Sequence, residues 1–155
     1  MKVKILSTDR IVNTKDSDLS FKNTNQSIRY DSYKPSGLWY GFGSSWLDWV
    51  ASEMPERKYK HLYKIEVNPS KLLVLNNERK VKLFAINFGL NKEKWEWTTE
   101  INWELVAKKY SGVEFNPYFY SLRLKPTMVG WYSGIDVASG CVWNKDAIKK
   151  IVKLI

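Results

Sequence analysis

Alternation of apolar and polar residues predicts short strands along this chain. Residues 2–8 (KVKILST) alternate, and so do residues 61–67, where Tyr63, Ile65 and Val67 share one face. Apolar runs predict further strands at 38–42, 72–75, 113–115 and 140–143, and a strand at 27–33 precedes a turn at 34–37. Residues 8–27 are rich in Asn, Ser, Thr and Asp and are expected to form a loop-rich excursion.

Apolar residues three and four positions apart predict helices between these strands. One begins at Ser44 or Ser45, ends at Pro55, and buries Leu47, Val50, Ala51 and Met54. Residues 78–90 hint at a second helix, with Val81, Phe84, Ala85 and Phe88 on one face, and Asn102 caps a third that buries Trp103, Val106, Ala107 and Tyr110. The final segment, with Ile148, Ile151, Val152 and Ile155, fits a short helix or, less obviously, an edge strand. Short strands and a few helices without βαβ alternation predict a single α+β domain over residues 1–155.

The aromatic content changes this picture of an ordinary domain. The chain has 8 Trp, 9 Tyr and 6 Phe, which is 15% of its residues. Such a density builds a ring-rich core or lines a stacking site. The stretch at 37–46, GLWYGFGSSW, concentrates four aromatic residues and three glycines, and packing alone rarely needs that many glycines beside rings. The Trp95-Glu96-Trp97 stretch with Trp103 forms either a loop that presents rings to a nucleobase or a patch over the core.

The chain is strongly basic, with a formal net charge of +9. Between Glu56 and Lys82 there are eight Lys and Arg against three Asp and Glu. This surplus suits a nucleic acid or an anionic cofactor, or is simply a soluble basic surface. No basic amphipathic helix with a clean apolar face stands out, so we expect no membrane attachment.

Few residues are available for nucleophilic or metal chemistry. Cys141 and His61 are single, which excludes an internal disulfide, a thiolate zinc site and a histidine pair. We expect Cys141 to be a buried inert thiol and His61 a partly buried structural residue. No phosphate-binding loop, dinucleotide fingerprint, nucleophile elbow or metalloprotease motif occurs, and no signal peptide is present. A cytoplasmic protein without a metal is expected.

Three segments in order resemble the ADP-ribosyltransferase fold, the family of diphtheria-toxin-like enzymes and poly(ADP-ribose) polymerases. They are GLWYGFGSS with the helix that follows, YKHLYKIEVNPSKLLVL, and ASGCVWNKDAIKKIVKLI, and with the strand around Arg29 they cover about two-thirds of the chain. The resemblance implies split mixed and antiparallel sheets around an NAD-type cleft with a few flanking helices. It also implies NAD as the substrate and no metal.

The resemblance assigns residues to this cleft. Trp39 or Tyr40 would stack on the nicotinamide, and Arg29 would clamp the pyrophosphate or ribose. The full set of cofactor-binding candidates is Arg29, Tyr30, Gly37, Trp39, Tyr40, Gly41, Ser44 and Ser45. Where the family carries a catalytic Glu at the start of its last strand, this chain has Ser139, so the carboxylate would come from Asp136 or from Glu114.

The function expected from this resemblance is mono-ADP-ribosyl transfer from NAD to a protein or a nucleic acid. Basic charge and aromatic rings favour nucleic acid as the acceptor. The Lys-rich composition fits an AT-rich genome such as that of a virus or phage. Two alternatives remain open: an inactive nucleotide- or nucleic-acid-binding module of the same fold, and a basic, aromatic-rich interaction protein unrelated to NAD.

Overall fold

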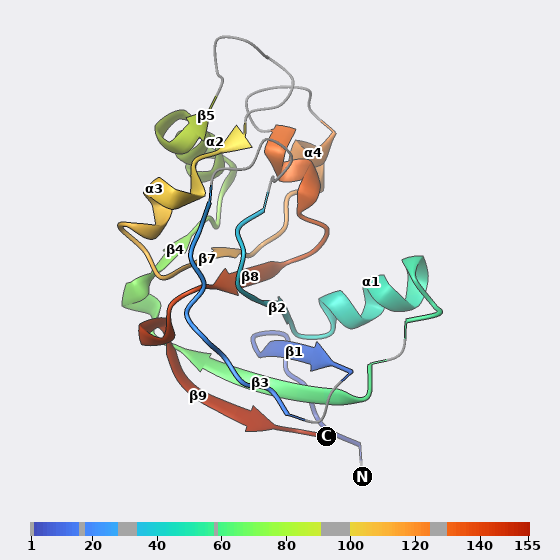
Figure 1. The fold of residues 1–155 in the computed structure, drawn as a ribbon. Coiled ribbons are helices and arrows are strands. Elements are labelled where there is room, and N and C mark those ends of the chain that lie inside the picture. Colours follow the sequence, from blue (N-terminus) through green and yellow to red (C-terminus); the bar gives the residue numbers. More distant parts are fainter. Residues whose placement is uncertain (1, 16–17, 28–33, 58, 91–99, 125–129) are drawn as a thin grey trace.

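The computed structural model describes residues 2–15, 18–27, 34–57, 59–90, 100–124 and 130–155. Its centre is a curled sheet in the order β4-β7-β8-β2-β1-β3-β9, in which neighbours are antiparallel except for the parallel pair β4 and β7 (Figure 1). The described residues also form four helices and a second, two-stranded sheet, so the protein is a single α+β domain, as expected.

The strands and helices follow the chain with short connections. The strands of the large sheet are β1 (Arg10–Thr14), β2 (Leu38–Phe42), β3 (His61–Val67), β4 (Leu72–Val74), β7 (Gly112–Phe115), β8 (Ser139–Val142) and β9 (Ile148–Lys153). The small sheet pairs β5 (Gly89–Leu90) with β6 (Glu100–Ile101). The helices are α1 (Ser45–Glu53), α2 (Glu78–Phe88), α3 (Trp103–Ala107) and α4 (Tyr120–Arg123).

The large sheet is split between β1 and β2. These strands share two residue pairs, Arg10 with Phe42 and Ile11 with Gly41, whereas β1 and β3 pair along the whole length of β1, to Thr14 opposite His61. Beyond Ile11 the two strands diverge. The sheet therefore consists of one half with β4, β7, β8 and β2, and another with β1, β3 and β9.

One face of the first half is covered by α2, α3 and α4, which lie above β4 and β7 in Figure 1. Aromatic rings fill the space between them. The ring of Phe84 on α2 lies 5.5 Å from that of Trp103 and 5.2 Å from that of Trp131, and Trp131 lies 6.0 Å from Phe115 on β7. Much of the aromatic content is thus a ring-rich core, in which edge and tilted contacts each contribute about 0.5–1.5 kcal/mol beyond burial.

The opposite, inner face of the curled sheet has its own apolar cluster. It is built from residues of β1, β2, β3 and β8, among them Val12, Phe42, Tyr63 and Val142. Leu19 and Phe21 of the irregular segment 18–27 pack against this cluster. The segment is held in place where the amide of Thr24 donates to the Trp143 carbonyl at 2.8 Å.

A buried carboxylate on this inner face links the two halves of the sheet. Glu114 on β7 accepts hydrogen bonds from the Arg10 guanidinium of β1, at 2.5 and 3.3 Å, and from the Tyr40 hydroxyl of β2, at 2.8 Å. Glu114, Gly140 and Tyr40 occupy one row across β7, β8 and β2. A Cβ atom on Gly140 would lie 2.5 Å from the Tyr40 ring, so the absence of a side chain there lets the phenol reach Glu114.

The first strand is not where the sequence pattern places it. Residues 2–6 form no strand, and Ser7 and Thr8 form a turn. The strand β1 lies instead at Arg10–Thr14, inside the stretch expected to be a loop. Because β1 is a central strand, Ile11 and Val12 are buried on opposite faces, and this removes the alternation that marks a half-buried strand. The expected strand at 27–33 falls almost entirely outside the described residues.

The last segment is the edge strand β9, which was the less obvious of the two expected alternatives, and not the short helix. Val67 pairs with Ile148, and Ile65 pairs with Ile151, because a bulge shifts the register between Glu66 and Val67. The extra residue places two isoleucines three positions apart on the same face. A β-bulge therefore imitates helical spacing in this sequence.

The helix α1 forms as expected, but it buries less than expected. Of its predicted core positions Val50 is buried, Leu47 is half-buried and Ala51 is exposed, and Met54 follows the helix as a half-buried residue. Figure 1 shows α1 projecting to the side of β2, away from the other helices. The apolar surface of α1 is thus only partly used by the core.

We expect Gly140→Ala to lower the free energy of unfolding by about 1–3 kcal/mol, because the new methyl group must displace the Tyr40 ring. Urea denaturation of the single and double variants measures this. In a Tyr40→Leu background the same alanine should cost much less, and an equal cost in both backgrounds would contradict the packing of the phenol over Gly140.

The turn before β1 gives the protein an acid-sensitive contact. The Asp9 carboxylate accepts hydrogen bonds from the Lys64 ammonium and the Leu6 amide, both at 2.8 Å, and these hold the pKa of Asp9 below its ordinary value. A lowered pKa in the folded state stabilises the protein above the unfolded pKa of about 4, and this stabilisation is lost as the pH falls through the folded pKa.

Asp9→Asn should therefore be less stable than the parent protein near pH 7, and the difference should shrink as the pH falls below about 4. Thermal melting across this range measures it. Asp146→Asn, which removes an exposed carboxylate, is the matched control and should show a smaller effect. A difference for Asp9→Asn that stays constant with pH would rule out this contact as its source.

Candidate functional site

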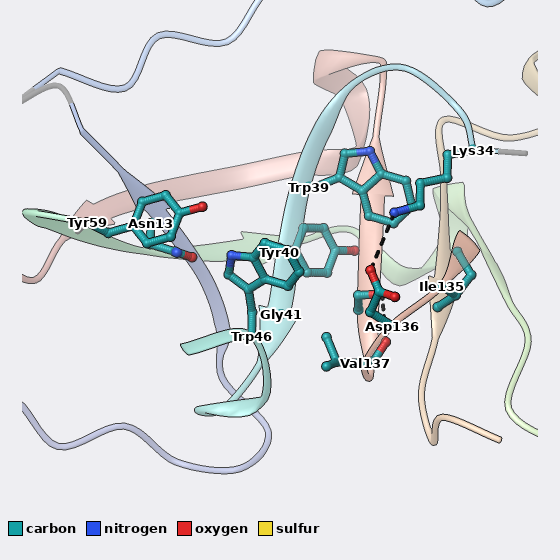
Figure 2. A pocket seen from close by; sticks show the side chains of 11 residues that line it. Asn13, Lys34, Trp39, Tyr40, Gly41, Trp46, Tyr59, Ile135, Asp136 and Val137 are labelled. Atoms are coloured by element: carbon teal, nitrogen blue, oxygen red, sulfur yellow. Dashed lines mark hydrogen bonds and ion pairs between the residues drawn. The ribbon is translucent and has the colours of Figure 1, made fainter. Parts of the chain in front are cut away.

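A pocket of about 340 Å³ opens where β1 and β2 diverge. Asn13 of β1 and Tyr59, which precedes β3, line one side (Figure 2). Trp39 and Gly41 of β2 line the other side, together with residues 135–137 and Ser139 at the start of β8. The split in the sheet thus creates the pocket.

Four aromatic residues line the pocket, namely Trp39, Tyr40, Trp46 and Tyr59. Trp39 is fixed by a parallel contact with Phe115, whose ring centroid is 6.4 Å away, and by its indole N–H, which donates to the Pro35 carbonyl at 3.3 Å. Trp46, in the first turn of α1, is stacked against Trp49 with centroids 5.0 Å apart and planes within 11°. Together with Tyr59 these rings offer flat surfaces to a planar ligand.

A carboxylate and two cations lie beside the Trp39 ring. Asp136 Oδ1 is 2.9 Å from Arg123 Nη1, and its Oδ2 is 3.8 Å from Lys34 Nζ. The Lys34 ammonium also lies 5.6 Å from the centre of the Trp39 ring. Figure 2 shows Lys34 and Asp136 facing each other across the edge of this ring. The pocket therefore combines a negative group with a cation that can meet an anionic ligand.

One polar group in the pocket wall has no hydrogen-bond partner among the residues that the structure describes. Asn13 Nδ2 is buried and makes no hydrogen bond within the part of the chain that the structure describes. Such a buried donor costs about 1–3 kcal/mol when it stays unpaired. A ligand with an oxygen acceptor would satisfy it.

Some of the residues expected to bind a cofactor line the pocket, and others lie outside it. Trp39, Tyr40 and Gly41 line the pocket, whereas Gly37, Ser44 and Ser45 do not. The Ser44 hydroxyl donates to Asp48 at 2.8 Å, and the Ser45 hydroxyl donates to the Ala138 carbonyl at 2.9 Å. Both hydroxyls thus serve contacts within the protein.

The glycines of GLWYGFGSSW are each explained by a close contact or a turn. A Cβ atom on Gly37 would lie 2.4 Å from the Val142 carbonyl oxygen, and one on Gly41 would lie 2.8 Å from the Trp46 Cβ. Gly43 has a φ of +59°, in the left-handed region that favours glycine. These contacts let α1 begin directly against β2, which brings Trp46 to the pocket.

The three candidate catalytic residues occupy different places. Asp136 and Ser139 line the pocket, and the Ser139 hydroxyl donates to the Val137 carbonyl at 2.9 Å. Glu114 does not line the pocket and is engaged by Arg10 and Tyr40 on the inner face. Asp136 is therefore the carboxylate available to a ligand in this pocket.

Tyr40 reaches the inner face with its phenol. Burial, followed by the nearby charge and hydrogen bond of Glu114, raises the pKa of Tyr40 well above its ordinary value. Burial lowers the pKa of Arg10, but the hydrogen bond and charge of Glu114 outweigh it and raise this pKa overall. Tyr40 thus stays a protonated donor and Arg10 a cation, and Trp39 is the ring of the pair that a ligand could meet.

Some of the expected site residues are outside the described part of the chain or outside the pocket, and some pocket residues were not expected. Arg29, Tyr30, Trp95 and Trp97 lie outside the described residues, while Trp103 is buried in the core. Asn13, Lys34 and Tyr59 were not expected as pocket residues, and Trp46 belongs to the GLWYGFGSSW stretch but was not assigned to the cleft. Trp46 follows the serine pair directly, so the glycine and serine stretch could have pointed to it. The other residues are joined to the pocket only by the pairing of β1, β2 and β3.

Other chemically active side chains lie away from this pocket. Cys141 is buried, and burial raises the pKa of its thiol well above the ordinary value, as expected for an inert thiol. Among the described residues, no three His, Cys, Asp or Glu side chains are grouped so that they could hold a metal ion. No helix in that same part of the chain is long and apolar enough to cross a membrane.

Comparisons with protein families, with curated proteins and with solved structures found no match to this chain.

The unpaired amide of Asn13 leads to a stability prediction. Asn13→Leu removes a buried donor and keeps a similar volume, so the free energy of unfolding should stay the same or rise by about 1 kcal/mol. Thermal and urea denaturation measure it. Asn77→Leu is the contrasting control, because the Asn77 side chain accepts from the Lys80 amide at the start of α2, and its loss should destabilise the protein. Strong destabilisation by Asn13→Leu would show that Asn13 has a structural partner.

Proposed function

We propose that this protein binds NAD in the split pocket and transfers its ADP-ribose to an acceptor, as a mono-ADP-ribosyltransferase-like enzyme. The observation that carries the proposal is the meeting of Trp39, Asp136 and Ser139 in one pocket at the divergence of β1 and β2. Such a split sheet around a cleft is what the resemblance in the sequence implies. At about 340 Å³ the pocket lies within the usual range of small-molecule sites, about 300–1,000 Å³.

The walls of the pocket suit the nicotinamide end of NAD. The pyridinium ring is flat and cationic, so it favours stacking on the Trp39 ring, in the place over this ring that the Lys34 ammonium now takes, 5.6 Å from its centre. The Asn13 side-chain amide would donate a hydrogen bond to the carboxamide oxygen of nicotinamide, and its buried Nδ2 would then have a partner. Lys34 would then meet the anionic pyrophosphate, which is one of the two parts of NAD, pyrophosphate or ribose, that the resemblance gives to Arg29.

The reaction breaks the bond between the ribose C1′ and the nicotinamide nitrogen. The bonding electrons leave with nicotinamide, which becomes neutral, and positive charge develops on the ribose as in glycoside hydrolysis. The acceptor then forms a new bond to C1′ through an oxygen or nitrogen atom, and its proton passes to solvent. Without acceptor, water takes this place.

Asp136 is the residue we assign to the developing positive charge. A carboxylate fixed beside the ribose stabilises such a transition state electrostatically. Arg123 holds Oδ1 at 2.9 Å, and this leaves Oδ2 towards Lys34 and the pocket. Ser139 occupies the strand start where the resembled family has its glutamate, and its hydroxyl would help to place the ribose or the acceptor. This chemistry needs no metal, and we place it in the cytoplasm, that of the host if the protein is viral.

A binding module without catalysis is the second candidate. It is favoured by the pairing of Asp136 with both Arg123 and Lys34, which reduces the negative charge available to a ribosyl cation. In that case the pocket would bind NAD or a related nucleotide and release no nicotinamide.

The test is incubation of the protein with NAD and chromatographic measurement of free nicotinamide, with and without protein and nucleic-acid acceptors. Asp136→Asn should reduce the rate of release about 100-fold, the scale on which single electrostatic contacts act in active sites. Asp146→Asn, an exposed carboxylate paired with Lys71, is the matched control and should retain the parent rate.

Two outcomes would contradict the enzymatic proposal. Nicotinamide release that is equal for Asp136→Asn and the parent protein would remove Asp136 from the mechanism. NAD binding by calorimetry without release under any condition would favour the binding module.

A further inference from the structure

The aromatic surface of the pocket continues outside it along α1. Trp46 lines the pocket, and Trp49 lies one turn further along the helix. Both side chains are half-buried, and Val50 is the residue of α1 that the core takes up. Two large rings are thus held at the protein surface next to the site of the proposed reaction.

The two rings form a preorganised stack. Their centroids are 5.0 Å apart and their planes differ by 11°, so each covers one face of the other. Trp46 packs directly against β2, because Gly41 has no side chain and leaves room there for the Trp46 Cβ. A ligand that stacks on this pair would need no rearrangement of the rings, which lowers the entropic cost of binding.

Three cationic residues lie in the chain close to pocket-lining residues on the β1 side of the split. Lys15 follows β1, and Arg57 and Lys60 flank the segment that carries Tyr59 into the pocket wall; all three side chains are exposed. The Lys60 amide donates to the Thr14 carbonyl at 3.1 Å, so Lys15 and Lys60 are on neighbouring chain segments. Lys34 adds a cation on the far side.

Stacked aromatic rings with cations on neighbouring segments indicate which kind of partner this surface would bind. A base stacks on aromatic rings whatever its sequence, and the phosphates that connect bases seek lysine and arginine. The helix α1 itself carries Asp48 and Glu53, which disfavours an anionic membrane surface on the rings and directs phosphates towards Lys15, Arg57 and Lys60.

We propose that Trp46 and Trp49 stack on a base of single-stranded nucleic acid, and that this strand is the acceptor of ADP-ribose. The statement about the acceptor rests on the proposed NAD reaction, whereas the stacking does not. In the transfer a ring or exocyclic nitrogen of the base would bond to the ribose C1′, nicotinamide would leave with the electron pair, and the nitrogen's proton would pass to solvent.

The first experiment measures binding of a fluorescent, mixed-sequence single-stranded oligonucleotide of about 16 nucleotides, the upper end of common site sizes. Trp49→Ala should weaken binding about 5- to 100-fold, the range for loss of one base stack. Trp49→Phe should recover part of the affinity because it restores a ring. Tyr120→Ala removes an exposed ring on α4 and should bind as the parent protein does.

The second experiment measures the dependence of binding on salt. Lys15→Gln with Lys60→Gln should lower the slope of log affinity against log salt by about 0.7 for each phosphate contact that is lost. Lys80→Gln with Lys82→Gln, exposed on α2, is the matched control and should leave the slope unchanged. Thermal melting of each variant separates loss of binding from loss of folding.

The outcomes distinguish this inference from the function on which it rests. Oligonucleotide binding that depends on Trp49 and persists at saturating NAD supports the stacking, even if no nicotinamide is released and the NAD reaction fails. Labelling of the oligonucleotide from radioactive NAD supports its role as acceptor.

Other results overturn the inference. Nicotinamide release without oligonucleotide binding leaves the NAD reaction standing and refutes the nucleic-acid acceptor. Loss of oligonucleotide binding on adding NAD would assign the rings to the adenine of NAD. Labelling of a protein acceptor alone, or binding to anionic vesicles in place of the oligonucleotide, would replace the partner proposed here.

Discussion

The ion pair between Glu114 and Arg10 is the interaction on which the large sheet depends. Two residue pairs between β1 and β2, and the hydrogen bond from the Gly43 amide to the Asp9 carbonyl, connect its halves through the backbone. The side chains on the inner face add to this connection. Glu114 is buried and receives both the guanidinium of Arg10 and the hydroxyl of Tyr40. Removal of one partner would leave a buried charge without compensation, which costs about 3–5 kcal/mol in comparable sites. We call the contact of Glu114 with Arg10 and Tyr40 the clamp. It holds the two halves of the sheet together although β1 and β2 separate beyond Ile11.

The pocket lies on the face of the sheet opposite the clamp. Tyr40 points its phenol into the clamp, so its neighbour Trp39 points to the opposite face, where the strands have diverged. A sheet with full pairing between β1 and β2 would have no opening there, and Asn13 would have no free space in front of its amide. The clamp and the pocket are thus made by alternate residues of one short strand, β2.

The sequence predicted well those features that depend on local pattern. The strands β2, β3 and β7, the helices α1, α2 and α3, and the cap residue Asn102 follow from periodicity and capping. It failed where long-range pairing decides the outcome, as for β1, which is buried on both faces. For β9 it left a helix and an edge strand open, because the bulge imitates helical spacing. In the candidate site, Trp39, Asp136 and Ser139 could be selected from the sequence. Arg10 could not be linked to Glu114, because 104 residues separate them and only the order of strands brings them together.

The row formed by Glu114, Gly140 and Tyr40 restricts how this protein can change in evolution. A side chain at position 140 is compatible only with a smaller residue at position 40, and a smaller residue there removes a hydrogen bond from Glu114. Glu114 in turn cannot become apolar while Arg10 remains. The four positions are therefore expected to vary together, and a lineage would pass between two stable solutions only through less stable intermediates.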